Sequence, residues 1–323
     1  MRRVQTLAKP RLDLGDVEDE FASSVIEGLS KAQKSLPCRY FYDARGSALF
    51  EDITRLPEYY PTRTEARILQ DHVDEMVAAI GKDELLVEFG SGSSLKTEIL
   101  LDRVGPSVAY VPIDVSEAAL ADAKERLARR YPMRDVRPIV ADFSRTVALP
   151  KDLASRRKTG FFPGSTIGNL SPREAEGLLK VFGSALGSAS RLIIGVDLKK
   201  DPRILVDAYS DAAGITAAFN LNLLRRINRE LGANFEECGF RHEAIYDPLK
   251  GRIEMHLVSL REQQVEVCGR AFRFKMNESI HTENSYKYTI EQFREVAHAS
   301  GWQPNRVWTD TKQQFSVHEL VWP

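Results

Sequence analysis

The segment Leu85-Leu86-Val87-Glu88-Phe89-Gly90-Ser91-Gly92-Ser93-Ser94 decides the fold. Its first five residues form a mostly apolar run that suits a buried strand, and the run leads directly into a Gly-x-Gly turn. Glycine has no Cβ, so the backbone at residues 90 and 92 can approach a ligand closely. The segment therefore predicts a ligand-binding turn at the carboxyl end of a strand, with a plain glycine-rich turn as the alternative.

Three nucleotide-binding classes compete for this turn. A dinucleotide fingerprint needs a third small residue three positions after the second glycine, and Leu95 occupies that position. A phosphate-binding P-loop needs glycine directly before Lys-Thr, and Leu95 also precedes Lys96 and Thr97. A methyltransferase binds a nucleoside that carries an amino acid tail and no phosphate, which a looser glycine turn can hold. The residues favour this third class.

Two further strands end in side chains suited to an adenosine. The run 110–116 places Asp114 at a strand end, 22 residues after Gly92, where its carboxylate can accept from both ribose hydroxyls. The next run ends at Asp142 and Phe143, an acceptor for the adenine amino group and an aromatic neighbour for its ring. Either aspartate alone could instead cap the following helix or turn. At the ends of successive parallel strands they favour an adenosine-binding crevice.

Short apolar runs alternate with helical patterns through the first two thirds of the chain, which is typical of βαβ units in a mostly parallel sheet. We interpret as strands 85–89, 108–113, 137–140, 159–162 and 192–196. Helices are expected over 64–80, 97–103, 117–131 and 173–186. After Asp197 a second α+β region is expected, with a long helix over 205–231 and strands over 254–259 and 271–274. One helix and two strands between 289 and 322 are expected to close the edge of the first sheet.

Composition excludes several classes of function. The chain has 323 residues with 45 Lys+Arg against 46 Asp+Glu, so its charge gives no reason to expect nucleic acid as a partner. Three widely spaced cysteines and six histidines without helical i, i+4 spacing predict no metal centre and fit a reducing cytoplasm. No stretch is apolar enough for a signal peptide or a membrane span, so we expect a cytoplasmic protein without membrane contact.

Longer motifs resemble a known family. The resemblance runs along nearly the whole chain and rests on residues 36–43, 46–50, 53–65, 88–93, 161–169, 195–200 and 209–220. The first of these reads Leu-Pro-Cys-Arg-Tyr-Phe-Tyr-Asp, and the fifth reads Phe-Phe-Pro-Gly-Ser-Thr-Ile-Gly-Asn. They are similar to the histidine Nα-methyltransferases of ergothioneine biosynthesis. Motifs of this length and composition are specific.

The resemblance implies an α/β fold with a Rossmann-like class I methyltransferase domain and a second, α+β substrate-binding domain. The first domain would comprise residues 64–199 and 287–323, and the second residues 1–63 and 200–286. The implied reaction is methylation of L-histidine by S-adenosylmethionine to the trimethylated betaine hercynine, the first step towards ergothioneine. We expect a monomer whose partner is a small amino acid, with no metal.

The resemblance also implies roles for individual residues. The cofactor would be held by Gly90, Gly92, Lys96, Asp114, Asp142 and Phe143. The implied catalytic residues are Tyr42 and Tyr59, which would line the site near the amine and the imidazole, and Tyr59 would also bind substrate. The substrate would further be bound through Asn169 and Tyr209 at its carboxylate and through Glu283 and Ser285 at its imidazole, with Met255 nearby.

Each assignment has a structural alternative. Tyr59 could be a packing aromatic, and Asn169 could be a turn residue after Gly168. The polar stretch 281–287, which contains Glu283 and Ser285, reads as a solvated loop by composition. Rival functions are methylation of another amino acid such as tryptophan, a nucleotide-binding oxidoreductase, and a ligand-binding module without activity.

Overall fold

The structure is a computed structural model that describes residues 14–78, 80–92 and 94–323. Ser93 of the glycine turn and the first thirteen residues lie outside the described part. The chain divides into two compact units. Unit 1 contains the chain up to Ile53, Tyr209–Ile245 and Glu254–Glu283, whereas unit 2 contains Thr54–Ala208, Tyr246–Ile253 and Asn284–Pro323. The domain boundaries expected after residues 63, 199 and 286 correspond to unit boundaries after Ile53, Ala208 and Glu283.

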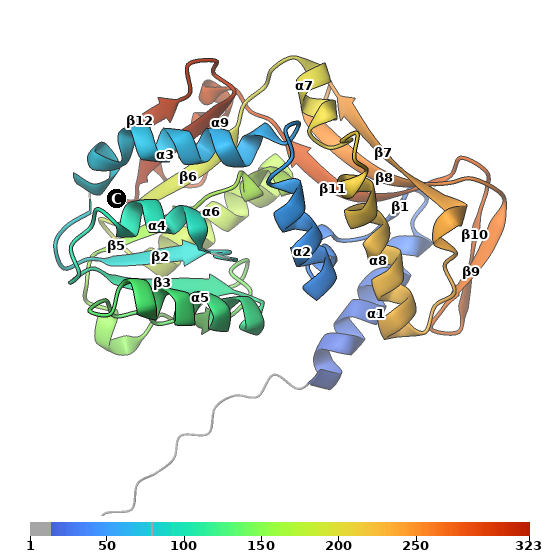
Figure 1. Cartoon of the computed structure of the whole chain (residues 1–323), viewed down its shortest axis with the longest axis horizontal. Coiled ribbons are helices and arrows are strands. Elements are labelled where there is room, and N and C mark those ends of the chain that lie inside the picture. The colour runs from blue at the N-terminus through green and yellow to red at the C-terminus, as the bar shows by residue number, and fades with distance from the viewer. Residues whose placement is uncertain (1–13, 79, 93) are drawn as a thin grey trace, which may run out of the picture. The chain divides into compact units, whose positions relative to one another are not determined.

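Unit 2 is built on a seven-stranded sheet in the order β12-β13-β6-β5-β2-β3-β4 (Figure 1). Its strands are β2 Leu85–Phe89, β3 Ala109–Asp114, β4 Ile139–Val140, β5 Lys158–Phe162, β6 Arg191–Asp197, β12 Gln303–Thr309 and β13 Phe315–Val321. Strands β2 to β6 run parallel, while β13 is antiparallel to both β6 and β12. The predicted α/β class is confirmed, including the two C-terminal strands that close the sheet edge.

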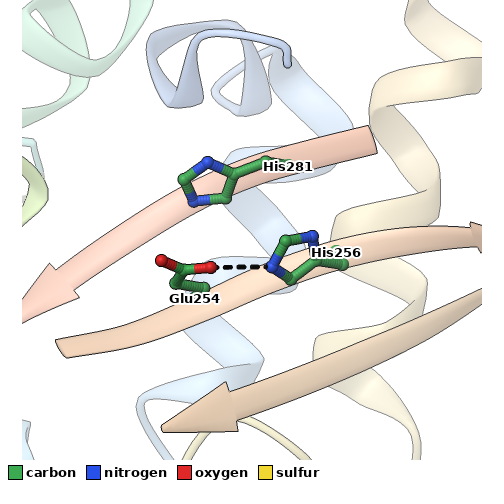
Figure 2. Close-up of side chains that lie close together, drawn as sticks. All are labelled: Glu254, His256 and His281. Carbon is green, nitrogen blue, oxygen red and sulfur yellow. Dashed lines mark hydrogen bonds and ion pairs between the residues drawn. The ribbon is translucent and has the colours of Figure 1, made fainter. Parts of the chain in front are cut away.

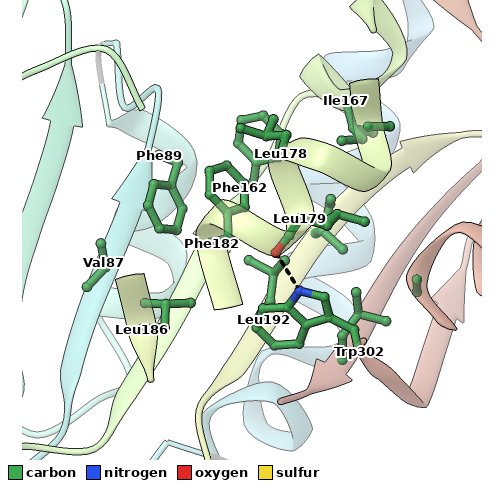
Figure 3. Close-up of a cluster of buried hydrophobic side chains, with 14 of the residues drawn as sticks. Val87, Phe89, Phe162, Ile167, Leu178, Leu179, Phe182, Leu186, Leu192 and Trp302 are labelled. Atoms are coloured by element: carbon green, nitrogen blue, oxygen red, sulfur yellow. Dashed lines mark hydrogen bonds between the residues drawn. The ribbon is translucent and has the colours of Figure 1, made fainter. Parts of the chain in front are cut away.

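Helices cover both faces of this sheet, so its central strands are buried and apolar on both sides. The helices of the unit are α3 Tyr60–Ala78, α4 Leu95–Leu101, α5 Glu117–Arg130, α6 Pro172–Leu186, α7 Pro202–Asp207 and α9 Ile290–Ala299. One hydrophobic cluster joins α6 and α9 to the sheet, and a second joins α3 and α4 to the opposite face. Figure 3 shows the first cluster, where the Trp302 indole donates to the Leu179 carbonyl at 2.8 Å.

Unit 1 combines helices with a four-stranded sheet in the order β1-β11-β8-β7 and a separate hairpin of β9 and β10. Its helices are α1 Leu14–Ser30, α2 Ala44–Ile53 and α8 Ile215–Leu231. Its strands are β1 Lys34–Ser35, β7 Phe240–Asp247, β8 Arg252–Ser259, β9 Gln263–Val267, β10 Arg270–Phe274 and β11 Ser279–Tyr286. Short 3-10 turns are η1 Cys38–Phe41 and η4 Glu237–Gly239 in this unit, and η2 Lys151–Leu153 and η3 Thr166–Asn169 in unit 2.

Asp43 fixes the start of α2 onto α8. Its carboxylate accepts from the Gly46 amide at 2.7 Å, from Asn222 Nδ2 at 2.9 Å and from the Arg229 guanidinium at 2.7 Å. The same side chain therefore supplies an acceptor to the unpaired N–H donors at the start of α2, and it links two helices that are far apart in sequence.

The expected continuous helix over 205–231 and the loop alternative for 281–287 were both wrong. The helix expected over 205–231 is interrupted, because Asp211 accepts from the amides of Ile215 and Thr216 at 2.9 and 2.7 Å and so starts a new helix. Gly214 enters that helix with a φ of +71°, a left-handed conformation that suits glycine. The polar stretch 281–287 belongs mostly to strand β11 and is not a solvated loop. Helices α1 and α2 and strands β7 and β9 were not expected.

None of the helices in the described ranges has the length and apolar character that crossing a bilayer would require.

Candidate functional site

The carboxyl ends of β2, β3 and β4 form one edge of the unit 2 sheet, and the predicted cofactor residues lie there. Gly90 and Gly92 both have positive φ values, +69° and +47°. The Gly92 amide donates to Asp114 Oδ2 at 2.8 Å, and the Ser116 amide donates to Asp114 Oδ1 at 2.9 Å. Asp114 thus fixes the glycine turn and the start of α5 together, and a carboxylate has lone pairs for further donors. A Cβ built on Gly92 would meet nothing within 4 Å, so the backbone borders open space there.

Asp142 and Phe143 follow β4 at the same edge. Asp142 Oδ1 accepts from the Ser144 amide at 2.8 Å and from its hydroxyl at 2.6 Å, which makes it a turn-forming residue as well as a candidate acceptor. The Phe143 ring lies edge-on to Phe162, with centroids 5.6 Å apart. A Cβ on Gly90 would come within 3.0 Å of Phe143, so glycine is needed for this ring to lie against the turn.

Lys96 forms an ion pair with Glu65, a carboxylate that is almost completely buried. Glu65 also accepts from the Gly164 amide with both oxygens at 2.9 Å. A Cβ on Gly195 would lie 1.9 Å from Glu65 Oε1, so the carboxylate occupies the space that this glycine leaves. Lys96 therefore links the helix after the glycine turn to the loop after β5.

The loop after β5 carries Asn169 at the end of η3. Ser165, just before η3, has a φ of +56°, which is strained for serine, and its hydroxyl accepts from the Asp197 amide at 2.9 Å. A Cβ on Gly168 would lie 2.8 Å from the Tyr286 carbonyl. This close approach holds η3, and with it Asn169, against the end of β11 where Ser285 lies.

A buried charge cluster surrounds Asp197 at the end of β6. The Lys287 ammonium donates to Asp197 Oδ2 at 2.7 Å, Lys200 donates to Oδ1 at 2.6 Å, and the Tyr60 hydroxyl lies 2.8 Å from both oxygens. Burial opposes ionisation of Asp197, but the two ammonium groups hold its pKa below the usual range. Burial lowers the pKa of Lys200 to about 8. The Lys287 side chain is completely buried, and it also donates to Ser285 Oγ at 2.7 Å.

Unit 1 carries the other predicted substrate residues. Tyr42 is 39% exposed, and its ring packs edge-on against Phe50 and Phe219 at 5.7 and 5.9 Å. Tyr209 is buried, and its carbonyl accepts from His242 Nε2 at 2.8 Å. Burial raises the pKa of the Cys38 thiol to about 12, and the nearby carboxylate of Glu283 adds to this shift.

Met255 and Glu283 do not point the same way. Met255 is buried on β8, and strand alternation sends its side chain to the face opposite Glu254 and His256. Glu283 follows His281 by two residues on β11, and the His281 ring lies 5.0 Å from that of His256. The predicted role of Met255 near Glu283 therefore stays a prediction, because the two side chains lie on opposite faces of the sheet. Tyr59 belongs to unit 2, where its side chain is buried, as is that of its sequence neighbour Tyr60.

Sequence reasoning missed three residues of the charge cluster. Tyr60 and Lys200 stand in the quoted motifs without a role, and Lys287 was included only as the end of a polar stretch. A buried lysine leaves no periodic signal, because its partner Asp197 lies 90 residues away in the chain. The available signal was the presence of a lysine beside a predicted binding residue, Ser285.

Glu88, at the end of β2, is a buried acid just before the glycine turn. Burial raises the pKa of Glu88 to about 7, although the Tyr110 hydroxyl donates to its carboxylate. The single hydroxyl proton of Tyr110 goes to Glu88, so the Ser94 hydroxyl, 2.9 Å away, donates to the Tyr110 oxygen. Ser94, in a left-handed conformation with a φ of +54°, is the N-cap residue just before α4, so this network holds the far side of the turn.

Comparison with known proteins gives consistent results. A family model described as histidine-specific methyltransferase, SAM-dependent, matches residues 21–322. The histidine N-alpha-methyltransferase of Mycolicibacterium smegmatis is 40% identical over 299 residues, covering 91% of this chain and 92% of that protein. The protein of the same name from Mycobacterium tuberculosis is 39% identical over the same shares. Ergothioneine biosynthesis protein 1 of Neurospora crassa is 32% identical over 89% of this chain and 33% of its own length.

Among solved structures, an S-adenosylmethionine-dependent methyltransferase from Clostridium acetobutylicum is similar with a TM-score of 0.49 and 11% identity. The similarity covers 84% of this chain and 97% of that structure.

Proposed function

The chain belongs to the histidine-specific, SAM-dependent methyltransferases, and from this premise we propose that it methylates the α-amino nitrogen of L-histidine with S-adenosylmethionine. It is an N-methyltransferase, and unit 2, which is built on the seven-stranded sheet, is its Rossmann-like class I methyltransferase domain. We propose further that three transfers give the betaine hercynine, the first step towards ergothioneine. The transfer requires no metal.

In this proposal the glycine turn and its neighbours hold S-adenosylmethionine. The backbone of Gly90 and Gly92 borders the methionine portion, Asp114 accepts from the ribose hydroxyls, and Asp142 accepts from the adenine amino group. Phe143 packs against the adenine ring. The open space at Gly92 supports this assignment. Lys96 acts through its ion pair with Glu65, which joins the turn to the loop that carries Asn169.

Methyl transfer from a sulfonium is an in-line displacement, so the site must align the amine lone pair and exclude water. The amine attacks only when neutral, and desolvation next to a sulfonium cation lowers the pKa of an ammonium group. Positioning therefore contributes more than a dedicated base. We assign the substrate carboxylate to Asn169 and Tyr209, and the surroundings of the amine to Tyr42 and Tyr59. Aromatic faces also suit a quaternary ammonium product, which has no N–H to donate.

The imidazole assignment rests on the hydrogen bond from Lys287 to Ser285. A lysine ammonium only donates, so Ser285 Oγ accepts from it at 2.7 Å and the serine proton points elsewhere. A hydroxyl held in this way is suited to donate to an acceptor, and a neutral imidazole has one unprotonated nitrogen. Glu283, two residues earlier on β11, is suited to accept from the other nitrogen. The hydrogen bond from Lys287 to Ser285 is the observation that supports this assignment of histidine as substrate.

The same polarity disfavours the rivals. An indole has a single N–H and no ring nitrogen that accepts, so Ser285 would lose a partner with tryptophan. An oxidoreductase is disfavoured because Leu95, at the first position of α4, prevents the close strand–helix contact of a dinucleotide turn. A silent module would not need a buried lysine to orient a serine.

Mass spectrometry of L-histidine incubated with the chain and S-adenosylmethionine tests the proposal, because it reports substrate and methyl count together. We expect mass gains of one, two and three methyl groups, and no gain with tryptophan or tyrosine. A thermal shift with S-adenosylhomocysteine but not with NAD is expected in parallel, since a specific ligand raises the unfolding midpoint. Methylation of tryptophan in preference to histidine would refute the substrate assignment.

A further inference from the structure

Two histidines and a glutamate gather on one face of the unit 1 sheet. Figure 2 shows Glu254 and His256 on β8 and His281 on the neighbouring strand β11, with the three side chains directed toward one another. One ligand-type atom from each lies within 4.8 Å of the other two. Glu254 and His256 are buried, and His281 is partly exposed. The histidines are 25 residues apart and meet only because the strands pair, so helical spacing did not reveal them.

We propose that Glu254, His256 and His281 form a binding site for a divalent transition metal ion, with Zn²⁺ as the reference ion. Two imidazoles and one carboxylate are ligands that Zn²⁺ and the neighbouring first-row ions accept, whereas Mg²⁺ and Ca²⁺ prefer oxygen alone. With neutral imidazoles the carboxylate gives the site a single negative charge, which a cation offsets. The proposal does not depend on the methyltransferase assignment and adds no step to it.

The distances fit a metal after a small adjustment. Zn²⁺ bonds of about 2.0–2.1 Å in a tetrahedron separate the ligand atoms by about 3.3 Å. His256 Nε2 and Glu254 Oε2 are already 3.1 Å apart. The largest separation, within 4.8 Å, requires an approach of about 1.5 Å at most, which side-chain rotation of the partly exposed His281 can provide.

Neighbouring polar groups hold the rings in place, as second-shell partners do at metal sites. His256 Nδ1 lies 3.2 Å from Ser279 Oγ, an acceptor for the proton that the imidazole carries on Nδ1 when Nε2 coordinates. His281 Nε2 lies 3.0 Å from the Glu283 carbonyl, which adds an oxygen to the rim of the cluster. Coordination replaces the hydrogen bond between His256 and Glu254, and neutral imidazoles coordinate without losing their proton.

Metal binding would join β8 to β11 by coordinate bonds. Because Glu283 is two residues from His281, a bound ion also restrains the strand segment that carries Glu283. We therefore expect Zn²⁺ to stabilise the chain against unfolding.

The test measures Zn²⁺ binding to the full chain without a histidine tag, by isothermal titration and by the visible absorption of Co²⁺. The exposed thiols of Cys238 and Cys268 would also bind Zn²⁺, so the background carries Cys238→Ser and Cys268→Ser. We expect one equivalent bound, and an affinity at least ten-fold weaker in His256→Gln and in His281→Gln. The matched control is His72→Gln, a histidine on α3 whose Nδ1 lies 3.1 Å from Glu75, and it should bind as the parent does.

Unfolding midpoints make the result interpretable even where a variant binds poorly. Zn²⁺ in hundred-fold excess over its dissociation constant should raise the midpoint of the parent by at least about 3 °C, and Mg²⁺ should not. Metal-free midpoints of the variants show that they fold. Absence of saturable binding by the parent, or equal affinity in the parent, His256→Gln and His281→Gln, would overturn the proposal. Neither outcome bears on histidine methylation, which is assayed separately.

Discussion

Replacing Lys287 by methionine tests the buried charge cluster and the imidazole assignment together. Methionine keeps the length of the side chain and removes the ammonium that binds Asp197 and Ser285 at 2.7 Å each. Breaking a fully buried ion pair costs about 3–5 kcal/mol. Asp197 keeps Lys200 and Tyr60 as partners, so we expect the lower end, about 3 kcal/mol. For a domain the size of unit 2 this corresponds to a fall in unfolding midpoint of about 6–12 °C.

The same substitution should change recognition of histidine. Ser285 loses its fixed donor, so its hydroxyl can rotate, and a hydrogen bond worth about 1 kcal/mol predicts a roughly five-fold higher KM for histidine. The affinity for S-adenosylhomocysteine should stay unchanged, because the glycine turn is not touched. Scanning calorimetry, initial rates and titration measure the three quantities.

A second variant separates charge from packing. Asp197→Asn with Lys287→Met removes both charges of that pair but leaves the buried Lys200 ammonium without its carboxylate, so the midpoint should fall further than in Lys287→Met alone. The reasoning fails if Lys287→Met unfolds at the parent temperature, or if its KM for histidine is unchanged below that temperature.

Further predictions concern single side chains. Glu283→Ala should reduce histidine turnover at least ten-fold and leave the dissociation constant of S-adenosylhomocysteine within two-fold, and equal turnover would contradict the role of Glu283 (~1.4 kcal/mol per factor of ten). Asp114→Ala should weaken S-adenosylhomocysteine binding at least ten-fold by titration, because both the ribose acceptor and the anchor of the Gly92 amide are lost. Burial raises the pKa of Glu88 to about 7, so the free energy of unfolding should fall by up to about 3 kcal/mol as the pH rises from about 4.5 through 7. Glu88→Gln should not show this fall when denaturation is measured at several pH values. His318 has its pKa lowered by burial to about 3, so stability falls as pH drops below 6.5, and in His318→Gln the slope of up to about 1.4 kcal/mol per pH unit should vanish.

The sequence predicted the sheet of unit 2 because its strands are buried on both faces. Residues 85–89 and 192–196 are apolar apart from Glu88, and such runs can only be placed between helices. The carboxyl-end aspartates could be located for the same reason, since each follows a recognisable run. The sequence does not reveal the hydrogen bonds that each aspartate makes within the protein, such as the one that Asp142 accepts from the Ser144 amide.

The sheet of unit 1 was predicted poorly because its strands do not alternate between apolar and polar residues. On β11 both faces carry polar groups: Thr282 donates to Asn220 Oδ1 on one side, and His281 contacts His256 on the other. A strand of this kind has the composition of a loop. The break before α8 was missed because Asp211 acts through backbone amides, which leave no trace in hydrophobic periodicity.

The contact between Gly168 and the Tyr286 carbonyl has a consequence for selectivity by length. It packs the turn that ends at Asn169 directly against the strand end that carries Ser285, so we expect this backbone contact to set the spacing between the groups assigned to the carboxylate and the ring. The two groups would therefore select substrates by the distance between the carboxylate and the ring. A homologue of histidine with one extra methylene should therefore bind through its carboxylate at Asn169 or through its ring at Ser285, but not through both. Such a homologue would be excluded by this spacing as well as by its larger volume.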